Sequence, residues 1–245
     1  MSNMSIIRPL PVSAIAGSMT DAERMLTPSP KEVSYSSATA ARTIDIDLGS
    51  AQDVGAIYLG GVSATANFTI TGGLGSYTTT ALGTAVVAPK SSSENPRQYL
   101  LMIDPPQSLR YIRLSANLTS GDEIGNLVVG ETFQPTLGHE YGGGRAIGDT
   151  GGATRLMSGG FGIESGATFG TWEFTLGDLT TDEIEALYTM LKKVGMTKPM
   201  VVVENPDVTA NLHNRIHYGL FEKISKYERL TPGETRWALQ IGEWV

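Results

Sequence analysis

The sequence predicts a mainly β protein with one main helix, in which a β-sandwich is joined to an α+β domain. Three observations predict this fold class. Short strand-like runs separated by turn residues fill the first half, a glycine-rich stretch follows residue 137, and one amphipathic helix stands among further strands in the second half.

Six short runs in the first half have the pattern of β-strands. Apolar and acidic residues alternate over residues 43–48, as in a strand with one buried face. Similar runs lie at residues 54–59, 67–71, 99–103, 110–116 and 127–129. Clusters of glycine, serine and proline separate them, so we expect an antiparallel sandwich. Ahead of these runs, Thr-Asp-Ala-Glu at residues 20–23 has the form of a capping box and predicts a short helical turn.

The composition changes after Phe-Gln-Pro at residues 133–135. Residues 138–160 are rich in glycine and poor in large apolar side chains, which predicts a linker or a long arm. Strand patterns resume at residues 171–176, 200–204, 215–227 and 236–241. We therefore divide the chain into an N-terminal extension (1–42), a sandwich (43–137), a glycine-rich arm or linker (138–160) and an α+β domain (161–245).

One helix is predicted among the strands of the second half. Thr180 is a suitable N-cap, Glu183 completes a capping box, and Gly195 ends the pattern. The apolar residues between them form a single stripe: Ile184, Leu187, Tyr188, Leu191 and Val194. A single stripe predicts a helix that packs on one face of a sheet.

Composition excludes several classes of protein. The 245 residues include 18 Lys and Arg against 25 Asp and Glu, a net charge of −7 that is spread over both halves and disfavours a nucleic-acid partner. The chain has no cysteine, which excludes disulfides, thiolate metal sites and cysteine nucleophiles. No apolar run reaches the roughly 18 residues of a membrane span, so we expect no membrane partner and folding in a cytoplasm.

Two groups of polar residues are candidates for metal or catalytic sites. His213 and His217 have the spacing of a metal-binding pair on a helix, but their surroundings predict a loop that enters a strand, and no glutamate follows the first histidine. Asp45 and Asp47 share one face of a predicted strand. Because apolar residues alternate with them, a solvated face is favoured over a paired-carboxylate site. We expect no metal site.

The glycine cluster does not predict a nucleotide site. Glycines 142–144 precede Arg145 but do not lie between a predicted strand and a helix, and no phosphate-binding loop or Gly-x-Ser-x-Gly motif occurs. We therefore expect no cofactor, no catalytic residues and no enzymatic activity. The glycines instead indicate a flexible loop or a place where another chain approaches closely.

Residues 43–131 resemble the discoidin or galactose-binding-like jelly roll. The resemblance rests on Asp-Leu-Gly at residues 47–49, which closes the first alternating run, and on Tyr-Ile-Arg-Leu at residues 111–114. It implies a jelly-roll sandwich that binds sugars, lipid head groups or proteins through loops at one end. The loops at residues 72–80 and 88–96 offer Tyr77 and Lys90 for such a role.

The second half is similar to the distal tail proteins of long-tailed phages. The resemblance rests on order: the glycine-rich stretch with Arg145 and Arg155, a strand with Trp and Phe at 171–176, the helix, and Lys-Pro-Met-Val-Val-Val at 198–203. It implies a tail-tube-like domain whose sheets join between subunits to form a ring, with six copies favoured and three next. It also implies a place in the virion, after synthesis in the host cytoplasm, with tube, hub and receptor-binding tail proteins as partners.

These observations together predict a structural protein of a phage tail tip or baseplate. The alternative is a carbohydrate-binding module with an accessory domain, and weak glycan binding is possible in either case. We expect the segment from residue 138 to 160 to be an arm that becomes ordered on assembly; a surface loop without contacts is the other interpretation. The expected subunit-interface residues are Tyr141, Arg145, Arg155, Met157 and Phe161.

Overall fold

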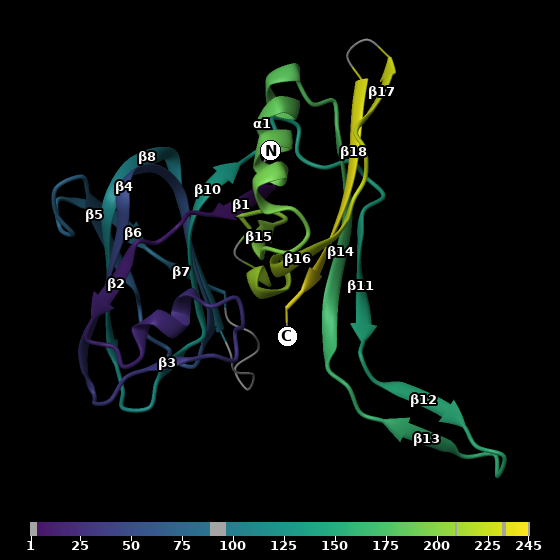
Figure 1. Cartoon of the computed structure of the whole chain (residues 1–245), viewed down its shortest axis with the longest axis horizontal. Helices are drawn as coiled ribbons and strands as arrows, with labels where there is room; N and C mark the ends of the chain where they lie inside the picture. Colours follow the sequence, from purple (N-terminus) through teal and green to yellow (C-terminus); the bar gives the residue numbers. More distant parts are fainter. Residues whose placement is uncertain (1–3, 89–96, 209, 232–233, 245) are drawn as a thin grey trace.

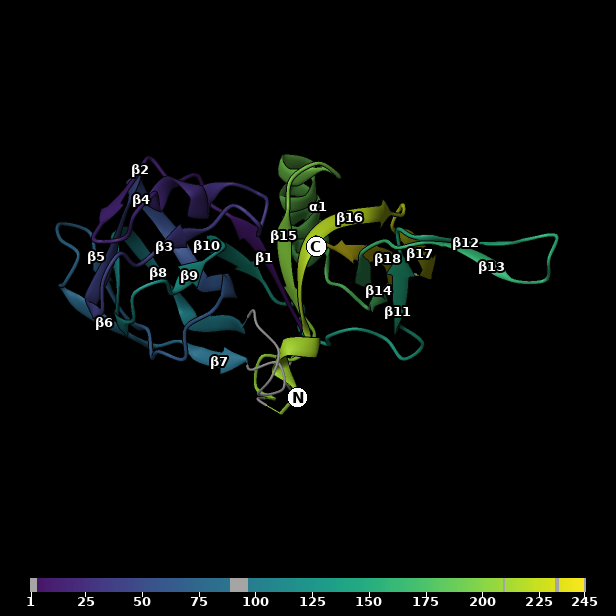
Figure 2. The same cartoon turned by 90° about the horizontal axis from the view of Figure 1, so that it is seen from below.

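The computed structural model describes residues 4–88, 97–208, 210–231 and 234–244, which are mostly β-strand with one α-helix, as predicted. The strands are β1 (Ser5–Pro9), β2 (Ala14–Gly17), β3 (Ser34–Tyr35), β4 (Ala40–Val62), β5 (Thr69–Gly73), β6 (Thr80–Thr84), β7 (Val86–Ala88), β8 (Arg97–Leu118), β9 (Glu123–Ile124), β10 (Asn126–Phe133), β11 (Gly144–Asp149), β12 (Gly152–Arg155), β13 (Phe161–Glu164), β14 (Thr168–Gly177), β15 (Met200–Val203), β16 (Ile216–Ile224), β17 (Glu228–Thr231) and β18 (Glu234–Glu243). The helical elements are α1 (Thr181–Val194) and the single turns η1 (Ala22–Leu26) and η2 (Leu212–Asn214). A sandwich lies at one end of the molecule and a long hairpin at the other (Figures 1 and 2).

The first half is a β-sandwich of the jelly-roll kind whose two sheets share the long strands β4 and β8. In one sheet, residues 44–47 of β4 pair with β2 and residues 111–115 of β8 pair with β5. In the other, residues 56–60 of β4 pair with β10 and residues 98–100 of β8 pair with β7. The register of the β4–β8 pair shifts between Asp47 and Gln52, where Gly49 has a φ of +80°. Each strand that was predicted as two runs is therefore one bent strand.

The sandwich core follows from the alternation seen in the sequence. Ile44, Ile46 and Leu48 are at most 4% exposed and point between the two sheets. Phe68 packs edge-on against Tyr99 at a ring-centroid distance of 4.8 Å. Among the described residues, this core is built from the first half alone.

Strand β1 belongs to both halves of the molecule. Ile6 lies opposite Phe133 of β10 on one side and opposite Val202 of β15 on the other, and both pairings are antiparallel. The sheet order β11-β14-β18-β16-β15-β1-β10-β4-β8 therefore runs without a break from the second half into the sandwich. Residues 5–17, inside the stretch expected as an N-terminal extension, thus supply one strand to the joint sheet and one to the sandwich.

In the second half, α1 packs on one face of the sheet, and its capping box forms as predicted (Figure 1). The Thr180 hydroxyl accepts from the Glu183 amide, and the Glu183 carboxylate accepts from the Thr180 amide at 2.8 Å. The buried stripe consists of Ile184, Leu187, Met190, Leu191 and Val194. Tyr188, which the sequence places on the same apolar stripe, is 48% exposed, because it lies at the margin of the stripe with its ring 6.5 Å from that of Trp237.

A separate apolar cluster seals the joint between the halves. Tyr58 of β4 stacks on Tyr218 of β16 with ring centroids 5.8 Å apart. Val201 and Val203 of β15 point into this cluster, while Val202 between them points to the α1 side. Strand β15 is thus buried on both faces, which explains its unbroken apolar sequence.

The first helical turn differs from the prediction. The N-cap of η1 is Asp21 with a φ of +54°, and its side chain makes no capping hydrogen bond. Thr20 instead forms an isolated β-bridge with Tyr35, so its backbone is committed to pairing. The expected capping box at residues 20–23 is not formed.

Candidate interaction site

Residues 144–177 form a long hairpin arm that projects from the sheet of the second half. Its root is β11, the edge strand, which pairs with β14. Beyond the root the chain continues as the two-stranded ribbon β12–β13, which points away from the body of the molecule (Figures 1 and 2). The tip is closed by hydrogen bonds from the Leu156 amide to the Gly160 carbonyl and from the Gly159 amide to the Leu156 carbonyl. The glycine-rich segment is therefore largely a β-hairpin.

Two glycines are required where the root meets the ribbon. A Cβ at Gly166 would lie 1.9 Å from the backbone nitrogen of Gly151, a separation that no side chain allows. The two strands approach this closely because Thr150 and Ala167 hydrogen-bond across the same junction. Close backbone approach, which the sequence indicated as a role for the glycines, here occurs within one chain.

The ribbon is covered with exposed apolar side chains. Met157 is fully exposed, Ile163 is 77% exposed and Phe161 is 63% exposed. The guanidinium of Arg155 lies over the Phe161 ring at 6.0 Å. A two-stranded ribbon with no second layer cannot bury these side chains, so they form an unpartnered apolar surface on the single subunit.

The residues predicted for the subunit interface fall into three places. Arg155, Met157 and Phe161 meet at the tip of the ribbon. Tyr141 precedes β11 and is fully exposed. Arg145 lies at the root of the arm, where its side chain is bound within the subunit. Whether any of them contacts another subunit stays a prediction.

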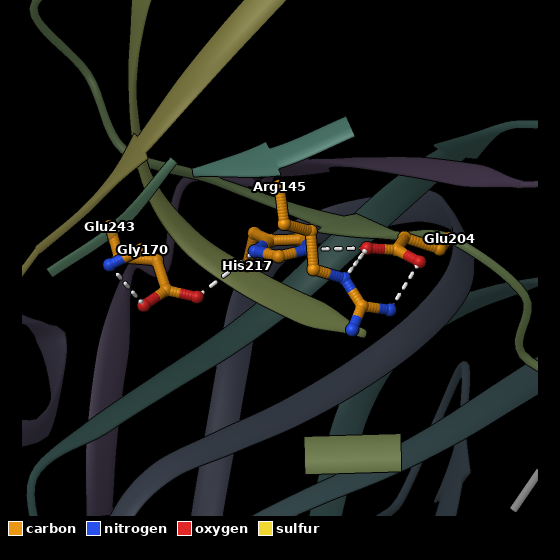
Figure 3. Close-up of polar contacts among 5 residues, drawn as sticks. All are labelled: Arg145, Gly170, Glu204, His217 and Glu243. Carbon is orange, nitrogen blue, oxygen red and sulfur yellow. Dashed lines mark hydrogen bonds and ion pairs between the residues drawn. The ribbon is translucent and has the colours of Figure 1, made fainter. Parts of the chain in front are cut away.

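A chain of charged side chains anchors the root of the arm to the sheet (Figure 3). The guanidinium of Arg145 on β11 donates two hydrogen bonds to the carboxylate of Glu204, which follows β15. His217 on β16 lies between two carboxylates, with Nε2 2.9 Å from Glu204 and Nδ1 2.9 Å from Glu243 of β18. Glu243 also accepts from the Gly170 amide of β14 at 3.0 Å. The network thus ties β11 and β14 to three other strands.

Burial and pairing set the charges in this network. Burial alone would raise the pKa of Glu204, but hydrogen bonds from Arg145 and His217 outweigh it and lower the pKa from 4.5 to about 2. Burial alone would lower the pKa of His217, but hydrogen bonds to Glu204 and Glu243 outweigh it and raise the pKa. Both ring nitrogens face carboxylates, which only accept hydrogen bonds, so this geometry stabilises the ring with both nitrogens protonated.

The sequence offered no signal for this anchor. The sequence spacing pairs His217 with His213, but His213 lies in η2 and His217 in β16, and the partners of His217 are 13 and 26 residues away. Strand pairing brings them together. His139 lies edge-on to Trp172 at 5.5 Å, and Trp172 in turn stacks on His217 at 5.3 Å.

The outer face of the sandwich carries a second group of ordered side chains. Arg113 makes a two-point contact with Asp45, at 2.6 and 2.7 Å, and Arg110 makes one with Asp47, at 2.9 and 3.1 Å. The Arg110 guanidinium lies 4.7 Å from the Tyr111 ring centre, and that ring is edge-on to a second aromatic ring. The predicted solvent-side aspartates are thus held in cross-strand ion pairs.

That second ring belongs to Tyr77, one of the two loop residues singled out in the sequence. Its centroid lies 5.0 Å from that of Tyr111, and the Arg113 guanidinium lies 5.3 Å over its face. We call Asp45, Asp47, Tyr77, Arg110, Tyr111 and Arg113 the aromatic–arginine patch. Lys90, the other loop residue, lies outside the described residues.

Within the described residues, no cluster of three or more His, Asp or Glu side chains is arranged to hold a metal ion. In the same part of the chain, no helix is long and apolar enough to cross a membrane.

No protein-family model matches the chain, and the comparison with curated proteins gave no match. Solved structures of CBM32 and related modules, which are galactose-binding-like jelly rolls, do match part of it. CpGH89CBM32-6 of Clostridium perfringens is 13% identical with a TM-score of 0.39, and the match covers 47% of this chain and 90% of that module. Chitosan-binding module 1 of a Paenibacillus sp. IK-5 chitosanase/glucanase is 17% identical with a TM-score of 0.39, and the match covers 51% of this chain and 99% of the module. The CBM32 of AlyQ, solved with 4,5-unsaturated mannuronic acid, is 16% identical with a TM-score of 0.38, covering 49% and 96%.

Proposed function

We propose that this chain is a non-enzymatic structural protein that assembles with copies of itself through the hairpin arm and carries the jelly roll as an attached module. The observation that carries the proposal is the exposed apolar surface of the ribbon. An apolar surface that the subunit cannot bury itself is a common mark of an interface. The edge strand β11 at the root of the arm adds unpaired backbone groups that a neighbouring sheet can complete.

The anchor network supports the same role. Arg145 and His217 hold the root of the arm in one orientation through Glu204 and Glu243, so the ribbon is presented by a fixed base. A preorganised base lowers the conformational entropy lost when the arm binds. An arm that is fixed at its root and apolar at its tip suits repeated, identical contacts around a ring.

The setting we propose is the tail tip or baseplate of a long-tailed phage, with this chain as the distal tail protein between tube and receptor-binding apparatus. The support lies in the order of elements in this chain: a hairpin arm, a sheet, and one helix laid across that sheet. None of the solved structures named above is a phage protein, so this setting rests on the second half alone. We favour a ring of six copies. A distal tail protein is part of the virion, so this role would place the chain there.

Light scattering on the purified protein, combined with electron microscopy, tests the assembly. We expect a closed oligomer for the natural sequence and a monomer for Met157→Asp, because a carboxylate at the tip is costly to bury. Leu74→Asp is the matched control, since Leu74 is 58% exposed on a loop of the sandwich, remote from the arm. A monomer at every concentration, or equal loss of assembly in both variants, would contradict the proposal.

Carbohydrate binding by the sandwich is a second candidate function, favoured by the aromatic–arginine patch. Tyr77 and Tyr111 supply aromatic rings, and the ion pairs to Asp45 and Asp47 hold the two guanidinium groups in fixed positions. Sugars stack on aromatic rings and accept hydrogen bonds from planar donors. Carbohydrate-binding modules are also the class of protein among the similar solved structures.

A glycan array tests this second function. We expect binding that falls about tenfold or more when Tyr77 or Tyr111 is changed to alanine. Tyr227→Phe is the control, because Tyr227 is a partly exposed tyrosine of the second half. Binding that is unaffected by both alanine variants would remove the patch as the site, and no binding to any glycan would remove the function.

A further inference from the structure

A groove lies at the joint between helix α1 and the sandwich. Its volume is about 560 Å³, and its walls come from both halves of the molecule. Leu26 and Leu127 line it on the sandwich side, and Val194 and Pro199 line it on the α1 side. The Tyr218 hydroxyl donates to the Pro28 carbonyl at 2.7 Å and fixes the two walls relative to each other. This volume accommodates several side chains but not a whole domain.

A second hollow of about 340 Å³ continues the groove along α1. Lys193 lines both hollows, and Phe133 and Met190 give the second one an apolar floor. The charge changes sign along this side of the molecule: Glu185 lines the second hollow, Lys193 near the end of α1 lines both, and Lys198, which follows α1, lines the first. None of these three side chains forms an ion pair within the described part of the chain.

The tip of the hairpin arm carries the complementary features. Leu156, Met157 and Phe161 are exposed apolar side chains of the size that the groove can hold. Arg155 lies beside Phe161 and has no carboxylate partner within the described residues. The tip therefore combines one positive charge with exposed apolar side chains.

The spacing on the two surfaces agrees at the tip of the arm. Glu185 and Thr189 are four residues apart on α1, which is about 6 Å at 1.5 Å per residue. Met157 lies two residues beyond Arg155, which is about 7 Å of extended chain. An arm tip laid along α1 with Arg155 at Glu185 can thus bring Met157 to Thr189.

We infer that the groove between α1 and the sandwich receives the arm tip of a second copy of this chain. The inference rests on the proposed assembly and names its acceptor site. In Figures 1 and 2 the ribbon β12–β13 points away from α1 and the sandwich of its own subunit, so the contact is made between copies. Such a head-to-tail contact uses two different surfaces, and repeating it generates a ring when the rotation closes.

Site-specific cross-linking tests the contact, and a chain without cysteine suits it. A Met157→Cys variant is mixed with a tagged Thr189→Cys variant and oxidised, because Thr189 lines the groove midway between Glu185 and Lys193. Thr181→Cys is the matched control, an exposed threonine on the same helix outside the groove. We expect a disulfide-linked heterodimer with Thr189→Cys and little or none with Thr181→Cys.

The outcomes separate the two proposals. If light scattering shows arm-dependent oligomers but the two cysteine positions cross-link equally or not at all, the groove is not the acceptor and the proposed function stands. If the protein is a monomer under all conditions, the proposed assembly fails and the acceptor site fails with it.

Charge reversal provides an independent measurement. We expect Arg155→Glu and Glu185→Arg each to weaken association about tenfold, since each places like charges together, and we expect the double variant to recover most of the loss. Glu23→Arg, an exposed acidic residue outside the groove, is the control for net charge. A double variant no better than the single ones would overturn this pairing and with it the orientation of the arm.

Discussion

The sandwich and the hairpin arm are both antiparallel β-structure, but their stability has different sources. In the sandwich, two sheets enclose a continuous core, and residues such as Ile46 and Phe68 are almost completely buried. In the arm, one ribbon leaves Met157 and Phe161 in solvent and is held by backbone hydrogen bonds and a charged anchor at its root. The comparison teaches that two packed sheets enclose their own core, whereas a single ribbon on the same sheet leaves apolar side chains unburied within the subunit.

The largest expected difference between the two regions comes from removing one aromatic ring from each of them. Phe68→Ala leaves a cavity beside Tyr99 and should cost about 3–5 kcal/mol of unfolding free energy. Phe161→Ala removes a ring that is 63% exposed and should cost less than about 0.5 kcal/mol in the monomer. Denaturant unfolding measures both. Similar losses for the two variants would show that the arm has a core of its own.

The next effect concerns the charged anchor and pH. The pKa of His217 is raised on folding, so its contribution to stability is complete below about 6.5 and is lost as the pH rises through the raised value. The pKa of Glu204 is lowered to about 2, so its contribution is complete above 4.5 and is lost as the pH falls toward 2. The anchor should therefore contribute most between pH 4.5 and 6.5.

Hydrogen exchange of the β11 and β14 amides across this pH range measures the anchor directly. We expect protection at the root of the arm to be highest inside the window, and His217→Gln to flatten the profile. The sandwich strands serve as the internal reference. A profile that is unchanged in the variant would mean that the anchor does not control the arm.

A smaller effect is expected at the start of α1. Thr180→Ala removes one side of the capping box and should cost about 1 kcal/mol. Thr189→Ala, on an exposed position of the same helix, should cost nothing, because alanine has the higher helix propensity. Thermal unfolding of the two variants checks the difference, and equal midpoints would mean that the cap is replaced by solvent.

The smallest effect on global stability is expected from Gly166, where the two strands of the arm approach each other most closely. Gly166→Ala forces apart strands that touch at Gly151, so the ribbon should lose protection while the unfolding midpoint stays the same. Gly152→Ala is the control, because a Cβ there meets nothing within 4 Å. A lowered midpoint in Gly166→Ala alone would show that the ribbon is coupled to the core.

The sequence predicted those parts of the fold that depend on neighbouring residues. The helix was predicted to begin after Thr180 and to end before Gly195, because the capping box, the apolar period and the terminal glycine all lie within 16 residues. Strand β4 was predicted as two runs, because a register shift near Gly49 interrupts the alternation and hides the continuity of the strand.

The sequence also predicted the part of the candidate site that depends on residues close together in the chain. Composition alone singled out Arg155, Met157 and Phe161 as the large side chains in a glycine-rich stretch, and they do lie together at the tip. The partners of Arg145 could not be predicted. Glu204 reaches it only through strand pairing across 59 residues, and no local pattern marks a carboxylate for that role.

The shared strand β1 is synthesised long before the two strands that flank it. Its neighbours β10 and β15 follow it about 120 and 195 residues later in the chain. At about 5–20 residues per second, roughly 10–40 s pass between the synthesis of β1 and that of β15. During this interval the sandwich can close with one side of β1 unpaired. The joint between the two halves is therefore completed only when β15 pairs with the free side of β1.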